Sequence, residues 1–135
     1  MSINKKDIVK LESIPVIYVK AQNGPKGARQ AFLKLESKLE SLRNRKFYGA
    51  FYVEKNKYHA CMAINDEHDK LLGFELDTIP GGMYTRKKIK NWMGKEKTIA
   101  PTFEKMAQSY IVDSNRPHIE FYRSQKELIL FLPIR

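Results

Sequence analysis

Residues 116–135 read RPHIEFYRSQKELILFLPIR and contain two apolar segments separated by a short polar stretch. This pattern predicts a β-hairpin. Every residue of the second segment, 128–132, is apolar, and the side chains of a strand alternate between its two faces. Because both faces are apolar, we expect this strand to lie inside a sheet and not at its edge.

The first segment of the hairpin places a carboxylate beside this covered strand. With a period of two, Ile119 and Phe121 share one face, whereas His118, Glu120 and Tyr122 share the other. Two interpretations follow from this pattern. Either the hairpin begins at the margin of the fold and Glu120 lies in water, or Glu120 points into a cavity with aromatic walls.

Length and charge limit the classes of protein to consider. A chain of 135 residues is long enough for one domain with a real core. The net charge of +10 raises the question of a polyanionic partner. However, the basic residues are spread along the chain, with only small clusters at 43–46 and 86–90. A solvated basic surface is therefore favoured over a nucleic-acid-binding face.

Several kinds of site find no support in the sequence. The single cysteine, Cys61, excludes an internal disulfide, and no histidine has the spacing of a metal ligand. We expect no metal and no cofactor. No apolar run is long enough to span a membrane, and residues 1–10 lack the apolar middle of a signal peptide. We expect a cytoplasmic protein without a membrane partner.

The first half of the chain reads as strand, helix, strand, strand. Residues 13–21 form a β-branched run that predicts a strand. In 28–42 apolar residues recur at intervals of three and four, which predicts an amphipathic helix. Two further strands are predicted at 47–54 and 58–64, with a short hairpin connection between them.

The second half begins with a similar stretch. Residues 78–86 echo the first strand: both contain an Ile-Pro pair, and Tyr84 follows Tyr18 at about half the chain length. A helix is predicted at 98–112, followed by the final hairpin. The alternative is a chance similarity of two short strands, but the matching order of elements favours a repeat with halves at about 13–64 and 73–135.

These elements predict an α+β fold. Two duplicated β-α-β-β units would form an antiparallel sheet with both helices on one face and a ligand cleft on the other, since clefts favour such seams. On the strand face away from Phe47 and Gly49, Tyr48 and Tyr52 would line the cleft, together with His59 from the next strand. A flat, solvated sheet face is the alternative interpretation.

Several short motifs resemble the GyrI-like small-molecule-binding family, which includes the effector-binding domains of AraC-type and MerR-type multidrug regulators. These motifs are 79–84 (IPGGMY), Trp92 and Gly94 before the second helix, and the endings 116–122 and 129–134. The resemblance spans the chain from about residue 13 to its end. No helix-turn-helix segment precedes residue 13, so we expect neither DNA binding nor direct transcriptional regulation.

The resemblance implies a ligand cleft with an acidic residue in the penultimate strand, a position that Glu120 matches. Tyr84 matches a tyrosine that follows the glycine pair, and Trp92 matches an aromatic residue in the pockets of some members. We therefore expect ligand contacts from Glu120, Tyr84, Trp92, Tyr48, Tyr52, His59, His118 and Tyr122.

Three functions fit these features. The first is binding of a small lipophilic, amphipathic or cationic molecule, since a carboxylate among aromatic rings neutralises a delocalised cation. The second is hydrolysis of a reactive small molecule by Glu120 and Tyr84, as the resemblance implies for one branch, because a desolvated carboxylate has a raised pKa suited to proton transfer. The third is a basic protein that binds nucleic acid or an acidic protein.

Overall fold

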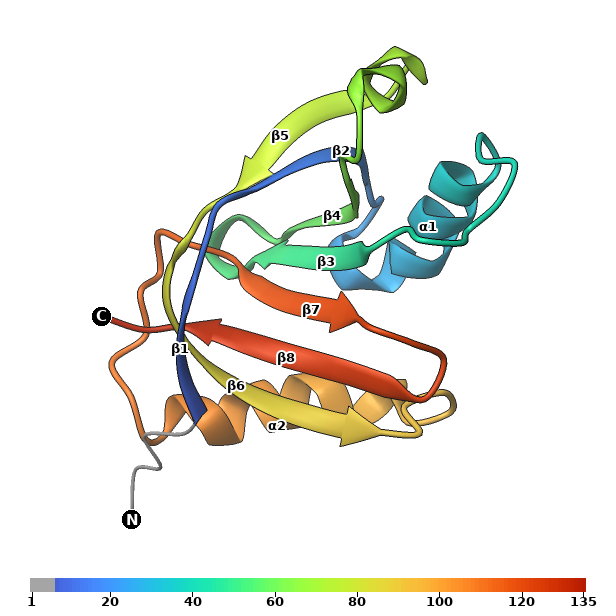
Figure 1. Cartoon of the computed structure of the whole chain (residues 1–135). Helices are drawn as coiled ribbons and strands as arrows, with labels where there is room; N and C mark the ends of the chain where they lie inside the picture. The colour runs from blue at the N-terminus through green and yellow to red at the C-terminus, as the bar shows by residue number, and fades with distance from the viewer. Residues whose placement is uncertain (1–6) are drawn as a thin grey trace.

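The computed structural model of the chain describes residues 7–135 (Figure 1). An eight-stranded antiparallel sheet has the strand order β1-β6-β8-β7-β3-β4-β2-β5. Its strands are β1 (Ile8–Leu11), β2 (Ile14–Lys20), β3 (Phe47–Tyr52), β4 (Lys57–Ala63), β5 (Glu75–Ile79), β6 (Gly82–Lys90), β7 (His118–Tyr122) and β8 (Glu127–Pro133). The two α-helices are α1 (Ala28–Glu36) and α2 (Ile99–Ala107). Short 3-10 helices are η2 (Gly24–Gly27), η3 (Val53–Lys55), η4 (Glu67–Leu71) and η5 (Glu96–Thr98).

The sheet is symmetric about its two central strands, β7 and β3. Gly49 pairs with Glu120 at the centre, and the flanking pairs are Phe47 with Tyr122 and Phe51 with His118. A two-fold rotation through the Gly49–Glu120 pair therefore exchanges the halves of the sheet. The apolar strand β8 lies between β6 and β7, as its sequence predicts.

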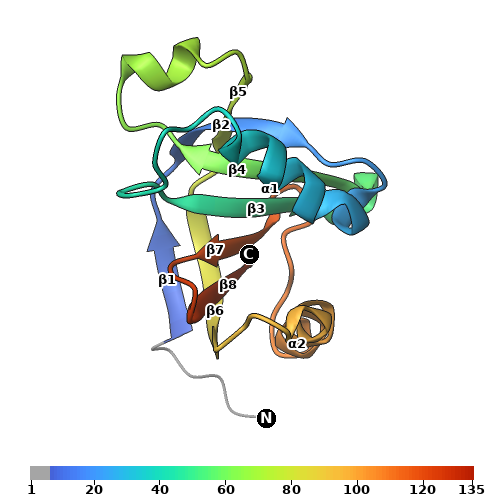
Figure 2. The same ribbon diagram turned by 90° about the vertical axis from the view of Figure 1, so that its right-hand side faces the viewer.

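Both helices lie on one face of this sheet, which confirms the α+β architecture expected from the sequence (Figure 2). Helix α2 places Phe103 against Leu130 of β8, and α1 places Leu35 against Met62 of β4. Amphipathic spacing explains the packing, because each helix turns its apolar stripe to the strands. Glu120 pairs with Leu130 across β7 and β8, so its side chain lies on the same face as the helices.

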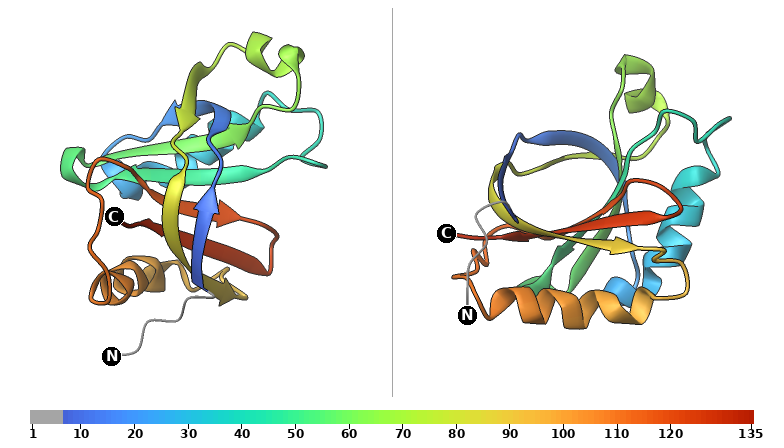
Figure 3. Two further views of the ribbon diagram at one scale, coloured as in Figure 1. Left: turned by 60° about the vertical axis from the view of Figure 1, so that its left-hand side comes forward. Right: turned by 60° about the horizontal axis from the view of Figure 1, so that its bottom comes forward.

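The other face is concave and largely filled with apolar side chains. The sheet curls so that the bent β1–β2 and β5–β6 segments cross this face (Figure 3). The buried residues of this cluster are Val16, Tyr48, Ala50, Cys61, Ile79, Tyr84, Ile119, Ile129 and Phe131. Within residues 7–135 no helix is long and apolar enough to cross a membrane.

The helices are shorter than their apolar periodicity predicts. Helix α1 ends at Glu36, and the predicted continuation to residue 42 is wrong. The hydroxyl of Ser37 donates to the carbonyl of Lys34 (2.6 Å) at the end of the helix. Leu42 is 49% exposed, so a longer helix would gain little from burying it. Similarly, α2 ends at Ala107, and Val112 instead forms an isolated β-bridge with Ile134.

The register corrects the alignment of the two halves. The two Ile-Pro pairs are not equivalent positions, because Ile14 and Ile79 pair directly with each other across β2 and β5. Tyr18 pairs with Cys61, whereas the counterpart pairing in the other half joins Arg86 with Phe131. The counterpart of Tyr18 is therefore Arg86 and not Tyr84. The short similarity misled because Ile14 and Tyr18 lie in one strand, whereas Ile79 ends β5 and Tyr84 lies in β6.

A buried ion pair fixes the loop between β4 and β5. Asp69 is 1% exposed and accepts hydrogen bonds from Arg45 Nη1 (2.8 Å) and from the backbone N–H of Asn65 (2.8 Å). Burial alone would raise the pKa of Asp69, but the bonds from Asn65 and Arg45 outweigh it and leave the pKa lowered. The ionised carboxylate thus joins η4 to the loop that follows α1.

We expect Asp69→Asn to lower the free energy of unfolding by about 1.5–3 kcal/mol at neutral pH, since bonds to a charged group are lost. Because the folded pKa is below the unfolded one, this contribution is present above the ordinary carboxyl pKa and disappears as pH falls through the folded value. Denaturant titrations at several pH values measure it. Glu67→Gln, in an exposed pair with Lys70, is the matched control and should change stability by less than about 0.5 kcal/mol.

Candidate functional site

The carboxylate of Glu120 lies at the centre of the helix-bearing face. Its side chain is 7% exposed. The hydroxyls of Tyr58 (β4) and Tyr122 (β7) both donate to Glu120 Oε1, each at 2.6 Å. Charged acceptors form short, strong bonds with hydroxyl donors. The two tyrosines therefore hold the carboxylate in one orientation.

Gly49 makes this arrangement possible. It faces Glu120 across the central strand pair, and a side chain at this position would overlap the hydroxyl of Tyr58. A Cβ atom at Gly49 would also lie 2.8 Å from Glu120 Oε1. The tyrosine hydroxyl thus reaches the carboxylate over the bare backbone of β3.

The second carboxylate oxygen, Oε2, differs from the first in its partners. No residue among 7–135 donates a hydrogen bond to it or forms an ion pair with Glu120. No buried side-chain oxygen or nitrogen of the described chain lacks a partner, so Oε2 keeps contact with solvent. One oxygen is held by two tyrosine hydroxyls, and the other has no donor within the described chain.

Burial dominates the electrostatics of this group. It raises the pKa of Glu120, and the hydrogen bonds from Tyr122 and Tyr58 act against this rise because they stabilise the charged form. Burial and the adjacent carboxylate also raise the pKa of both Tyr58 and Tyr122. The hydroxyls therefore keep their protons and remain donors to the carboxylate.

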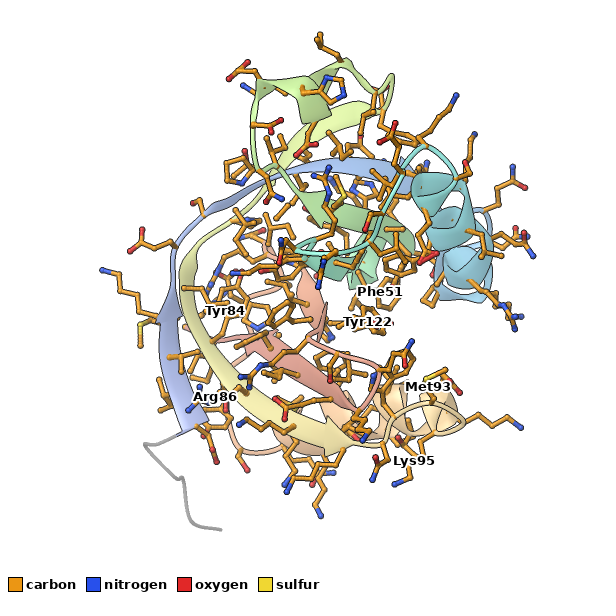
Figure 4. The ribbon with its side chains drawn as sticks, turned by 45° about the vertical axis from the view of Figure 1, so that its right-hand side comes forward. Phe51, Tyr84, Arg86, Met93, Lys95 and Tyr122 are labelled. Atoms are coloured by element: carbon orange, nitrogen blue, oxygen red, sulfur yellow. The ribbon has the colours of Figure 1, made fainter. Side chains whose placement is uncertain are left out.

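Aromatic rings surround the carboxylate; we call Phe32, Phe51, Tyr58, Trp92 and Tyr122 the aromatic cage. Phe32 of α1 meets Tyr122 edge-on (ring centroids 5.3 Å apart) and Tyr58 at 6.3 Å. Trp92, in the loop after β6, meets Tyr122 at 5.0 Å, and its Nε1 donates to the carbonyl of Ser124. Phe51 lies 6.4 Å from Tyr58. Figure 4 shows Phe51 and Tyr122 between α1 and the loop of Met93 and Lys95.

Four of the eight residues expected at the ligand lie on this face: Glu120, Tyr122, His118 and Trp92. His118 packs under α2 against Phe103, with ring centroids 4.8 Å apart. Burial lowers the pKa of His118 to about 4, so its imidazole is neutral at physiological pH.

Tyr84 and Tyr48 lie on the opposite face of the sheet. Tyr84 is fully buried, donates its hydroxyl to the carbonyl of Pro80 (2.6 Å) and lies under the guanidinium of Arg116. Tyr48 stacks on Phe121. The expectation that Glu120 and Tyr84 face one cleft is therefore wrong, because strand parity places them on opposite faces.

Tyr52 and His59 also lie on that opposite face, away from Glu120. There they line an open hollow of about 450 Å³ together with Tyr18, Lys20, Lys55, Lys57 and Asp77. The structure thus divides the predicted residues between two sites: the cage around Glu120 and this hollow.

Sequence reasoning missed three members of the cage: Tyr58, Phe32 and Phe51. The parity of β4 already separated Tyr58 from His59, and the parity of β3 placed Phe51 with Gly49. What the sequence lacked was the pairing of β3 with β7, which brings these residues to Glu120. Phe32 belongs to the predicted helix, and no local signal distinguishes it from a core residue.

No group of three or more histidine, cysteine, aspartate or glutamate residues in 7–135 is arranged to hold a metal ion. The groups that the structure brings together at Glu120 are its carboxylate, the two tyrosine hydroxyls and the neighbouring aromatic rings.

The sequence matches no protein-family model and no curated protein, but solved structures share its fold. An integron cassette protein, VCH_CASS2, from the mobile metagenome of Vibrio cholerae has a TM-score of 0.71 at 15% identity, over 95% of this chain and 94% of that one. SAV2435 bound to tetraphenylphosphonium has a TM-score of 0.60 at 12% identity, over 95% and 92% of the two chains.

A protein described as a putative bacterial transcription regulation protein, from Staphylococcus aureus MU50, has a TM-score of 0.57 at 12% identity, with 95% of this chain and 96% of that chain covered. At these identities the likeness extends to the fold. The chain therefore shares its fold with SAV2435, whose structure contains tetraphenylphosphonium.

Proposed function

We propose that this protein binds small lipophilic cations, and that Glu120 within the aromatic cage is the charged contact. The observation that carries the proposal is a buried carboxylate whose Oε2 has no hydrogen-bond donor and no cationic partner among residues 7–135. Leaving a buried charge unpaired is costly, and a bound cation removes that cost.

The aromatic rings supply the second part of the recognition. Ring faces attract cations through their quadrupole and provide apolar contact at the same time. An aromatic cation spreads its charge over a large apolar surface, so it suits a site of five rings and one carboxylate. The fold is shared with SAV2435, whose structure contains tetraphenylphosphonium, and this supports the choice of ligand class.

A ligand of that size must displace side chains to reach Glu120, because the carboxylate is only 7% exposed. Trp92 is held by its bond to the carbonyl of Ser124, whereas the half-buried rings of Phe32 and Phe51 carry no hydrogen bond and are the groups free to turn. In contrast, Tyr58 is 1% exposed and is held by its bond to Glu120. The floor of the site is therefore fixed and its walls are adjustable.

The net charge of +10 does not prevent cation binding. Screening reduces the field of distant surface charges over about 8 Å at physiological salt, so the nearby carboxylate dominates. The alternative function, hydrolysis, would require Glu120 and Tyr84 to act on one substrate. The two residues lie on opposite faces of the sheet, which argues against it. Tyr58 and Tyr122 are poor substitutes for Tyr84 as proton donors, because the pKa of each is raised.

We expect Glu120→Gln to weaken tetraphenylphosphonium binding by about 1.5–3 kcal/mol, or roughly 10- to 150-fold, because an interaction with a charged group is lost. Trp92 is the only tryptophan and belongs to the cage, so quenching of its fluorescence reports on this site directly. Glu104→Gln, on the exposed side of α2, is the matched control and should keep full affinity.

Tetraphenylborate has the same shape as tetraphenylphosphonium and the opposite charge, so it separates charge recognition from apolar contact. The wild-type protein should prefer the cation at Trp92, and Glu120→Gln should lose that preference. Equal loss of both ligands would mean that the substitution disturbs the pocket and that Glu120 does not select the cation. Steep weakening of binding with added salt would favour a polyanion site instead.

Cation binding should weaken on acidification. The raised pKa of Glu120 means that the carboxylate takes up a proton at a higher pH than an ordinary glutamate, whose pKa is 4.5. Affinity for tetraphenylphosphonium should therefore fall through that raised value, while Glu120→Gln shows no such step. A midpoint at about 4, where His118 titrates, would assign the effect to that histidine.

Stability should follow the opposite trend. A folded pKa above the unfolded one means that the contribution of Glu120 is fully present below the unfolded pKa and is lost as pH rises through the folded pKa. Glutamine keeps an oxygen that accepts both tyrosine hydroxyls and carries no charge. We therefore expect Glu120→Gln to be at least as stable as the wild type at neutral pH in thermal unfolding. A loss above about 1 kcal/mol would show that the charge itself stabilises the fold.

A further inference from the structure

The open hollow on the face away from the helices is separate from the cage. It has a volume of about 450 Å³, which is within the range of small-ligand sites. Tyr18 and Lys20 come from β2, Tyr52 from β3, and Lys57 and His59 from β4. Strands β2, β4 and β3 are neighbours, so the floor of the hollow belongs to the sheet.

Stacked rings form the inner wall. His59 stacks on Tyr18, with ring centroids 4.1 Å apart and an angle of 15° between planes, and Tyr52 lies 5.4 Å from His59. Three flat side chains thus adjoin one another on this part of the sheet. Flat ring systems of ligands stack on such a wall.

The rim is cationic. Lys20, Lys55 and Lys57 line the hollow and are exposed, whereas Asp77 is the single carboxylate that lines it. Burial lowers the pKa of His59. The charge of Asp77 acts to raise this pKa, and the charges of Lys20 and Lys57 lower it further. The imidazole is therefore neutral at physiological pH, and the lining has a net positive charge.

The other half of the sheet has no such group. By register, the counterparts of Tyr18, Lys20 and His59 are Arg86, Lys88 and Ile129. The two-fold arrangement therefore does not require stacked tyrosine and histidine at this place. Their presence in one half is a local feature that needs its own explanation.

We propose that this hollow is a second binding site, which takes a flat aromatic ring carrying an anionic group, as in a mononucleotide. The ring packs beside Tyr52 and the stacked Tyr18–His59 pair, and the anionic group lies among Lys20, Lys55 and Lys57. Asp77 lies 3.9 Å from Nδ1 of His59 and so disfavours an anion beside that nitrogen. This site is independent of Glu120, which lies on the opposite face.

The test uses AMP as the probe and the NMR signals of the His59 ring as the readout. AMP should shift these signals and raise the pKa of His59, because a nearby phosphate favours the imidazolium. Adenosine and inorganic phosphate, each lacking one half of the recognition, should bind at least about tenfold more weakly. Phosphate as strong as AMP, or no saturable shift with AMP, would overturn the proposal. Binding of a single-stranded oligonucleotide but not of AMP would also overturn it.

Charge-matched variants place the anion. Lys55→Ala with Lys57→Ala should weaken AMP binding about tenfold or more, since two charge-assisted contacts are removed. Lys87→Ala with Lys88→Ala removes the same charge from exposed positions of β6 and should have little effect. If both double variants lost the same affinity for AMP, the effect would come from the net charge of the protein. That result would contradict a specific site in the hollow.

The two sites are distinguished by cross-tests. Glu120→Gln should leave AMP binding unchanged, and tetraphenylphosphonium should not displace AMP. Failure of cation binding at Glu120 would leave these results unaffected, so the two proposals stand or fall separately.

Discussion

The structure depends on the contact between Glu120 and the backbone of Gly49 at the centre of the sheet. Glu120 faces a position without a side chain, and this space lets the Tyr58 hydroxyl reach its carboxylate. Burial opposes ionisation, while the bonds from Tyr122 and Tyr58 support it. The result is a buried carboxyl group with one oxygen held by two hydroxyls and the other without a protein donor.

Local patterns predicted the strands well. The apolar run of β8 indicated an inner strand, and the hairpin with β7 follows from it. The alternation of β7 also separated Glu120 from Ile119 and Phe121 correctly. Each of these inferences needs only the geometry of one strand or one hairpin, which depends on residues that are close in sequence.

Inferences that required pairing between distant segments failed or were incomplete. Parity alone cannot say whether Glu120 shares a face with Tyr48 or with Gly49, since this depends on the register of β3 and β7. Tyr84 was assigned to the same cleft because of a short motif, and its register places it in the opposite core. Tyr58 was overlooked because its partner lies far along the chain. The predicted end of α1 lay too far along the chain, because apolar periodicity carries no information about the hydrogen bond of the Ser37 hydroxyl.

The two-fold arrangement has a consequence for the charge at its centre. In a sheet assembled from two identical chains, the same residue would occupy both central positions. Two glutamates would bring like charges into one buried space, and two glycines would leave no charge at all. A single chain escapes this constraint, because it can place an acid in one half and the space for it in the other. At the two-fold axis, therefore, the two halves of the sheet differ: one contributes an acid and the other a glycine.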